Sequence, residues 1–231
     1  MTATKELTGS HATSEWTGFT GRLGAWYLAS RYRRLAELLV LGNLRPRLLR
    51  ALDLRGDELV VDAGCGSGFY SLAIAGRLTS GRVICVDLSD EMMARLARRT
   101  ARQGLSGRVD IRKGDVTALD LDEGLAGWAV SNGVWHELRE PAQAARELFR
   151  VLQPGGRVVV TDFRDTRLGR RIAAAHRAGD HGPFSVDELK ALLEAAGFAR
   201  VGAEPVGHWV LAWGRKPSPL QGDGGRDRVG H

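Results

Sequence analysis

The sequence predicts an α/β fold, a doubly wound and mostly parallel sheet of seven strands with helices on both of its faces. Short apolar runs alternate with segments of helical periodicity along most of the chain, which is typical of repeated strand–helix units. The first run ends at Asp62, and a glycine-dense turn joins it to the next helix. The last two runs are separated only by residues 205–207. Because so short a connection cannot hold a crossover helix, the last strand must be antiparallel.

The individual elements follow from local pattern. Strands are predicted where β-branched and other apolar residues run together between turn residues. Their ranges are 58–63, 82–87, 108–112, 127–132, 156–162, 198–204 and 207–214. Helices are predicted where apolar residues recur every three or four positions. Their ranges are 20–30, 33–51, 68–77, 90–103, 141–152, 167–176 and 185–196. This order of elements predicts a Rossmann-like sheet.

A chain of 231 residues suits one domain with a sizeable core. Residues 1–15 are polar and predict a flexible tail. Residues 16–52 predict N-terminal helices that form a helical lid on the substrate side. The main binding domain is predicted at 53–216. Residues 217–231 are rich in proline and glycine, and we expect disorder there.

The composition, 43% hydrophobic and 26% charged, is typical of a globular protein. Cys65 and Cys85 form neither a disulfide framework nor a paired metal motif, which favours a reducing, cytoplasmic location. The polar N-terminus lacks the apolar core of a signal peptide. No apolar run approaches the roughly 20 residues of a membrane span, so we expect no integral membrane segment. The stretch 26–42 fits a membrane-surface helix or a helix over a cleft, and we favour the cleft.

The net charge of +6 comes largely from arginines spread over predicted helix faces. An acidic partner such as nucleic acid is one interpretation, and a solvated surface is the other. No aromatic residues interleave with a basic stripe, as single-strand binding requires. Nucleic acid is therefore not favoured as a partner. The oligomeric state is left at monomer or homodimer.

The glycine turn has the register G-x-G-x-G, running through Gly64, Gly66 and Gly68. Glycine suits a turn on which a ligand must lie against bare backbone. A dinucleotide fingerprint requires glycine at its sixth position, where this chain has Phe69. A dehydrogenase is therefore the weakest interpretation. Asp87 ends the next predicted strand, where a ribose diol would be held.

Four segments in order carry a family resemblance. They are the glycine motif at 60–68, the second-strand acid with its downstream serine and methionine at 86–92, a Gly-Asp pair at 114–116, and an Arg-Val-Leu-x-Pro-Gly-Gly segment at 148–160. With these motifs the chain resembles the class I S-adenosylmethionine-dependent methyltransferases. The branch it resembles includes the ubiquinone and menaquinone C-methyltransferases. The resemblance covers roughly residues 35–215 and implies S-adenosyl-L-methionine as the cofactor.

The resemblance also implies which residues hold the cofactor. Asp62 and the glycine backbone would meet its ammonium, Asp87 would accept from both ribose hydroxyls, and Asp115 would accept from the adenine amino group. The implied residues are Asp62, Gly64, Cys65, Gly66, Gly68, Asp87, Leu88, Met92, Gly114, Asp115, Val116, Ser131 and Asn132. A turn role for Asp115 and a core role for Met92 stay open as alternatives.

The end of the fourth predicted strand should show the acceptor chemistry. It lacks the Pro-Pro-Tyr/Phe element of base amino methyltransferases, the cysteine of cytosine C5 enzymes and the metal-binding carboxylates of the catechol type. The quinone-type family commonly has Leu-His-His here, and this chain has Trp135, His136 and Glu137. His136 is the candidate catalytic base, or it only shapes the pocket.

Further residues are candidates for the substrate pocket. They are Trp26, Tyr27, Trp135, His136, His176 and His181. His176, Asp180 and His181 do not form a metal site, because their spacing crosses Gly179 and supplies no fourth ligand. We therefore predict no metal.

The resemblance implies methyl transfer to a small organic acceptor by in-line displacement. An RNA or protein methyltransferase and a catalytically silent cofactor-binding module are the alternatives, since a fold does not determine function.

Overall fold

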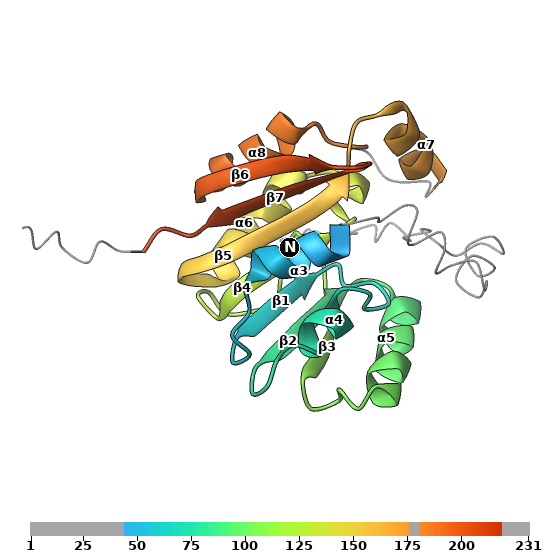
Figure 1. Cartoon of the computed structure of the whole chain (residues 1–231), viewed down its shortest axis with the longest axis vertical. Helices are drawn as coiled ribbons and strands as arrows, with labels where there is room; N and C mark the ends of the chain where they lie inside the picture. Colours follow the sequence, from blue (N-terminus) through green and yellow to red (C-terminus); the bar gives the residue numbers. More distant parts are fainter. Residues whose placement is uncertain (1–43, 176–180, 219–231) are drawn as a thin grey trace, which may run out of the picture.

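A computed structural model describes residues 44–175 and 181–218, with side chains up to residue 171 and again from 181. The predicted helix at 20–30 and most of the predicted N-terminal lid and tails lie outside these ranges. Within them one sheet carries helices on both faces (Figure 1).

Seven strands form the sheet in the order β3-β2-β1-β4-β5-β7-β6. Their bounds are β1 Leu59–Ala63, β2 Arg82–Asp87, β3 Val109–Lys113, β4 Ala126–Asn132, β5 Leu152–Phe163, β6 Ala199–Val206 and β7 Trp209–Arg215. The pairs among β1 to β5 are parallel, whereas β7 runs antiparallel to both β5 and β6. This confirms the predicted Rossmann-like fold and its antiparallel last strand.

The strand order reverses between β1 and β4, which are neighbours although two strands separate them in sequence. Asp62 lies opposite Cys85 of β2 and Val130 of β4. The carboxyl ends of these strands therefore lie side by side where the strand order reverses. In doubly wound sheets this is where ligands bind.

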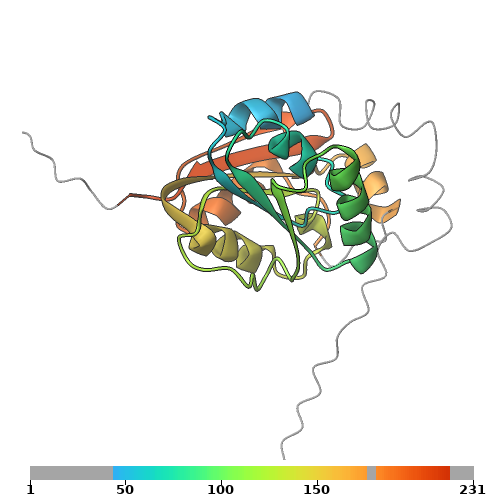
Figure 2. The same ribbon diagram turned by 90° about the horizontal axis from the view of Figure 1, so that it is seen from below.

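The helices divide between the two faces of the sheet. They are α3 Leu44–Leu52, α4 Ser71–Ala75, α5 Asp90–Arg102, the 3₁₀ turn η1 Trp135–Glu137, α6 Pro141–Val151, α7 Arg167–Ala175 and α8 Val186–Ala195. Side chains of α3, α4 and α5 join one apolar core, and those of α6 and α8 join the other. Figure 2 shows α3 and α6 on opposite sides of the strands. Helix α3 contacts β5 and β7.

Two elements differ in length from their predicted ranges. The helix predicted at 68–77 is reduced to α4, because glycines with positive φ hold the preceding residues in turns. The strand predicted at 156–162 begins at Leu152, since Gly155 N–H donates to the Lys216 carbonyl at 2.9 Å and extends the sheet. Gly155 has φ +79°, which suits a turn after Pro154.

Helix α5 begins directly after the tip of β2. Ser89 is its N-cap and accepts from the Met92 N–H at 3.3 Å, while Asp90 and Glu91 occupy its first turn. Further along the helix, Arg99 donates to the Ser67 carbonyl at 2.5 Å. The helix is thus held both to the end of β2 and to the glycine turn after β1.

The arginine of the Arg-Val-Leu segment holds a loop in place. Arg150 donates to the carbonyls of Leu121 at 2.7 Å and Leu119 at 2.8 Å. Its ion-pair partner Glu147 accepts from the Leu119 N–H at 2.8 Å. These bonds fix the helix-free connection between β3 and β4, whose first residues include Asp115. In the described ranges, no helix combines the length and apolar character needed to cross a membrane.

Candidate functional site

A cavity of about 680 Å³ opens at the carboxyl ends of β1, β2 and β4. Its volume is in the range of small-molecule sites. The lining residues are Gly64, Cys65, Gly66, Ser67, Phe69, Tyr70, Asp87, Leu88, Met92, Asp115, Val116, Thr117, Asn132, Gly133, Val134, Glu137, Leu138, Arg139, Glu140 and Gln143. Nine of the thirteen residues predicted to hold a cofactor are therefore in one wall: all except Asp62, Gly68, Gly114 and Ser131.

The three glycines of the turn differ in what requires them. All three have positive φ, +78° at Gly64, +51° at Gly66 and +78° at Gly68. A Cβ at Gly64 would clash with Val134, and one at Gly68 would clash with Leu96. A Cβ at Gly66 would meet nothing within 4 Å. Gly64 and Gly68 thus permit close packing, whereas Gly66 leaves open space on the cavity side.

Asp87 connects the tip of β2 to the glycine turn. One carboxylate oxygen accepts from the Gly66 N–H at 2.7 Å, and the other accepts from the Ser89 N–H at 2.9 Å. Burial raises the pKa of Asp87, against the opposing effect of these two N–H donors. Each oxygen can accept a further hydrogen bond, so Asp87 offers a fixed pair of acceptors to a diol in the cavity.

Asp115 takes part in a turn and also lines the cavity. Its Oδ1 accepts from the N–H of Thr117 at 2.8 Å and from the Thr117 hydroxyl at 2.7 Å. This turn bonding uses one carboxylate oxygen. Gly114 lies behind the wall, where a Cβ would come within 2.9 Å of Val86.

Asp62 and Ser131 lie just behind the glycine turn rather than in the wall. Asp62 is only 1% exposed; its Oδ2 accepts from the Ser71 hydroxyl at 2.6 Å, and its Oδ1 has no hydrogen-bond partner. Burial, and secondarily the charge of Asp87, raise the pKa of Asp62 to about 7. Ser131 donates to the Ala63 carbonyl at 2.8 Å and accepts from the indole of Trp135 at 3.1 Å.

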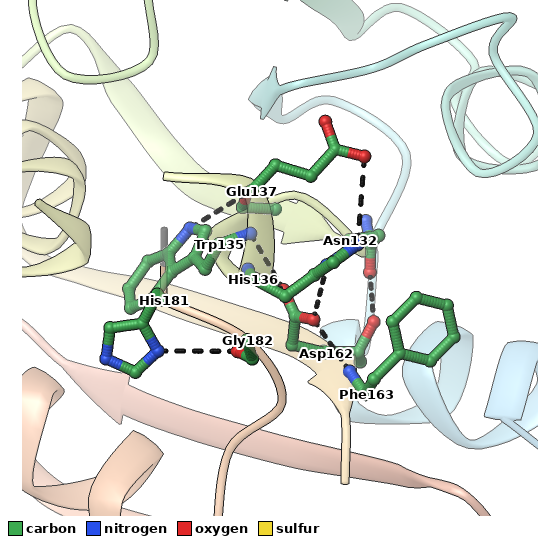
Figure 3. Close-up of polar contacts among 10 residues, drawn as sticks. Asn132, Trp135, His136, Glu137, Asp162, Phe163, His181 and Gly182 are labelled. Carbon is green, nitrogen blue, oxygen red and sulfur yellow. Dashed lines mark hydrogen bonds and ion pairs between the residues drawn. The ribbon is translucent and has the colours of Figure 1, made fainter. Parts of the chain in front are cut away.

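His136 is fully buried behind the cavity wall, between two carboxylates (Figure 3). Its Nδ1 lies 2.8 Å from Oδ1 of Asp162, and its Nε2 lies 3.7 Å from Oε1 of Glu137. Burial lowers the pKa of His136, but the charges of Asp162 and Glu137 outweigh it, and the net shift is upward. Of these three residues, Glu137 is the one that lines the cavity.

Asp162 also organises the backbone around His136. Its Oδ2 accepts from the N–H groups of Trp135 at 2.7 Å and His136 at 3.2 Å, and its Oδ1 accepts from the Phe163 N–H at 2.7 Å. The ring of Phe163 packs edge-on against His136 with centroids 4.7 Å apart. The imidazole is therefore held both by charge and by packing against an aromatic ring.

The other predicted pocket residues lie elsewhere. Trp135 is fully buried in the core. His181 stacks on Phe184 with ring centroids 4.3 Å apart, and its neighbour Gly182 donates to the His136 carbonyl at 3.1 Å. His181 is not in the cavity wall, although its segment supports His136. Trp26, Tyr27 and His176 lie outside the described residues. Across the described ranges, no three His, Cys, Asp or Glu side chains gather as a metal site would require.

Sequence reasoning missed Asp162 and Tyr70. Asp162 ends a predicted strand much as Asp62 and Asp87 do, so the same signal was present in the sequence, and the structure pairs that strand with β4. Glu137 was noted only as a neighbour of His136, yet it is the member of the pair that reaches the cavity. Tyr70 belongs to no motif that would have identified it from the sequence.

The comparisons with known proteins agree with this geometry. The family described as a methyltransferase domain matches residues 61–160. A demethylmenaquinone methyltransferase of Clavibacter sepedonicus is 32% identical over 149 residues, 62% of this chain and 58% of the relative. Residues 61–160 thus match a methyltransferase domain. A probable S-adenosylmethionine-dependent methyltransferase of Mycolicibacterium smegmatis is 34% identical over 152 residues, 60% of this chain and 51% of the relative.

Solved structures share the fold of this methyltransferase domain. A SAM-dependent methyltransferase from Aquifex aeolicus matches with a TM-score of 0.62 and 24% identity, covering 74% of this chain and 88% of that one. The [4+2]-cyclase SpnF matches with a TM-score of 0.64 and 22% identity, covering 76% and 81%. The chain spans 32% to 58% of the length of the first curated relatives that it matches.

Proposed function

We propose that this protein transfers the methyl group of S-adenosylmethionine to a small organic acceptor. The observation that carries the proposal is the single cavity that joins a glycine wall and two strand-end carboxylates to a further carboxylate, Glu137, backed by His136. The cofactor supplies an electrophilic methyl group on a sulfonium. The protein has to bind it, exclude water and align an acceptor in line with the transferred carbon.

The residues present fit the cofactor. The open space over Gly66 is a cradle that any larger residue would narrow. Asp87 provides two acceptors for the ribose hydroxyls, and Asp115, Val116 and Leu88 line the end where adenine would lie. The buried Oδ1 of Asp62 has no donor, and an ammonium, directly or through a water, would complete it.

At the acceptor end we assign different roles to His136 and Glu137. The upward pKa shift favours the imidazolium form of His136, which cannot accept a proton. Glu137 lies in the wall, so its carboxylate is the group that accepts the acceptor's proton as the bond to the methyl carbon forms. His136 then acts as a positioning residue, since its charge holds Glu137 and is itself held by Asp162.

A small acceptor suits the enclosed volume, and in-line transfer needs mainly positioning. The same fold occurs in a structure titled a [4+2]-cyclase, so the fold by itself does not determine the chemistry. The deciding experiment is incubation with a methyl-labelled donor and a fractionated metabolite extract. We expect label in one small compound. Label in RNA or protein, or cofactor binding without any turnover, would contradict the proposal.

Once that compound is known, two variants separate the roles at the acceptor end. Glu137→Gln should lower kcat by roughly 10²-fold or more, as loss of a general base does. His136→Asn should keep part of the activity. It should also shift the pH dependence of kcat, because the charge of His136 acts on the Glu137 carboxylate. An unchanged kcat in the Glu137→Gln variant would show that Glu137 is not the base.

A further inference from the structure

The side chain of Asn132, the last residue of β4, carries a hydrogen-bond donor that the fold does not use. Asn132 lines the cavity, and its Nδ2 is buried and has no hydrogen-bond partner among the described residues. Leaving a buried donor unsatisfied is costly, and a leucine of similar size would avoid that cost. A ligand in the cavity would give the amide a function.

A second side chain holds the amide of Asn132 in one orientation. Thr161 of β5 lies opposite Asn132 in the parallel pair of strands, and its hydroxyl donates to Asn132 Oδ1 at 3.0 Å. Thr161 is fully buried, so water does not compete for this bond. Because the amide oxygen is engaged in this way, Asn132 has its Nδ2 left for a ligand, and an amide nitrogen can only donate.

Glu137 complements this donor with a hydrogen-bond acceptor. Glu137 is the last residue of η1, the element that follows β4, and it lines the same cavity as Asn132. In the proposed function it takes up the proton of the methyl acceptor. Its charge and that of Glu140 in the same wall disfavour a carboxylate as the reacting group, because like charges repel at close range. The group that fits this wall gives a proton to Glu137 and accepts a hydrogen bond from Asn132.

The number of lone pairs on the reacting atom decides which methyl acceptor fits both side chains. A hydroxyl oxygen has one proton and two lone pairs. Its proton can pass to Glu137, one lone pair can attack the methyl carbon, and the other can accept from Asn132. A neutral amine nitrogen has a single lone pair, which the attack itself uses. A reacting carbon atom likewise has none to offer, so in both cases the donor of Asn132 would stay unsatisfied.

We infer that the methyl acceptor is a hydroxyl compound that is methylated at oxygen, with Asn132 donating to the oxygen that reacts. The inference rests on the proposed function, because it names the acceptor class of the same cavity. An electron pair of the oxygen forms the new bond to the methyl carbon, the carbon–sulfur bond breaks with its pair going to sulfur, and the hydroxyl proton passes to Glu137. The products are a methyl ether and S-adenosylhomocysteine. Because a carboxylate is a weak base, an acidic hydroxyl such as a phenol or an enol fits better than an aliphatic alcohol.

The position of the methyl group in the product tests the inference directly. The wild-type protein is incubated with a donor that carries a ¹³C-methyl group and with the metabolite extract, and NMR of the labelled compound shows which atom bears the methyl carbon. We expect a methyl ether. A methyl group on nitrogen, carbon, sulfur or a carboxylate would overturn the inference and leave the proposed function standing. Absence of any labelled small compound would overturn the proposed function instead.

Asn132→Asp tests the donor itself. The change keeps an oxygen that can accept from Thr161 and replaces only Nδ2, so kcat/KM for the labelled compound should fall about tenfold or more. Asn132→Leu gives the same comparison without an added charge. Both variants should bind S-adenosylhomocysteine in calorimetry as the wild type does. Equal losses of cofactor affinity and kcat/KM would assign Asn132 to the cofactor alone, and an unchanged kcat/KM in both variants would show that the donor is not used; either result would overturn the inference.

Thr161 offers a matched pair of variants for the orientation of the amide. Thr161→Val removes the hydroxyl that holds Asn132 Oδ1 and should lower kcat/KM for the labelled compound. Thr161→Ser keeps a hydroxyl and should recover part of that loss. Equal losses in the two variants would mean that the methyl group of Thr161 matters and its hydroxyl does not, which would contradict the positioning role.

Discussion

At the proposed nucleoside end of the cavity the carboxylates of Asp87 and Asp115 are held by backbone N–H groups, whereas at the proposed acceptor end Glu137 is backed by the side chains of His136 and Asp162. The first arrangement depends on the course of the chain and needs few particular side chains. The second places three ionisable groups one behind another. Ligand binding at the first end therefore depends mainly on fixed backbone groups. At the second end, single side-chain substitutions can change the chemistry.

The depth of burial also differs between the ends. Asp87 and Asp115 line the cavity, so their substitution should change binding with little effect on folding. His136 and Asp162 are fully buried, and their substitution should affect folding as well. Substitutions at the two ends should therefore differ in whether they change folding or binding.

Asp162→Ala should be the most destabilising change in the site. It would leave the N–H groups of Trp135, His136 and Phe163 without their acceptor and would remove the partner of a buried imidazole. Loss of one member of a buried pair costs roughly 3–5 kcal/mol. Urea denaturation measures the free energy of unfolding. A loss below about 1 kcal/mol would mean that the acceptor end is not organised around this carboxylate.

Asp87→Ala should weaken S-adenosylhomocysteine binding by roughly 1.5–3 kcal/mol, or about 10- to 150-fold, with a small change in melting temperature. The matched control is Asp110→Ala, on the neighbouring strand, whose carboxylate pairs with Arg112 at the surface. Calorimetry on both variants gives the comparison. If Asp87→Ala binds as tightly as Asp110→Ala, the ribose does not lie at the tip of β2.

Gly64→Ala and Gly66→Ala should have different effects, the first mainly on stability and the second mainly on cofactor affinity. Both force a positive φ on alanine, at a cost of roughly 1–2 kcal/mol. Gly64→Ala adds a clash with Val134 and should be the less stable protein. Gly66→Ala has room for its methyl group, which projects into open space, and should lose cofactor affinity instead. Thermal melts measure the stability of the two variants, and calorimetry measures their cofactor affinity. Equal losses of stability and affinity in both variants would contradict these different roles of Gly64 and Gly66.

The affinity for S-adenosylhomocysteine should depend on pH through Asp62. Burial raises the pKa of Asp62 to about 7, so below that pH the carboxyl is protonated and cannot pair with an ammonium. Affinity should therefore rise with pH and level off above about 7, with a slope of at most about tenfold per pH unit. Calorimetry between pH 5.5 and 8 should show this for the wild type, while Asp62→Asn should give a flat profile.

Much of the cavity wall at the glycine turn and the tip of β2 could be predicted from sequence because its signals are local. A glycine turn after a strand and an acid at the next strand's tip each occupy a few consecutive residues, and the observed β1 and β2 confirm the predicted strands. The roles of the individual glycines were not predictable. Gly64 is required by Val134 and Gly68 by Leu96, and both neighbours are distant in the chain.

The acceptor end was predicted less well because its contacts join separate elements. His136 was identified as a candidate base, but only the fold shows it behind Glu137 and against Asp162 of β5. Arg45 of α3 lies over the ring of Phe69, a residue of another segment that lines the cavity. No spacing rule along the chain reports such a contact.

The amino-acid sequence alone determined the order of strands and helices, the turn geometry of the glycine loop and the chemical family of the domain, because apolar periodicity and glycine conformations act over a few residues. Only the tertiary structure decided which carboxylates face the cavity and which are buried. Burial and electrostatic coupling are properties of neighbours in space, and the causes that shift the pKa values of Asp62 and His136 include Asp87 and Asp162, which lie far from them in the chain.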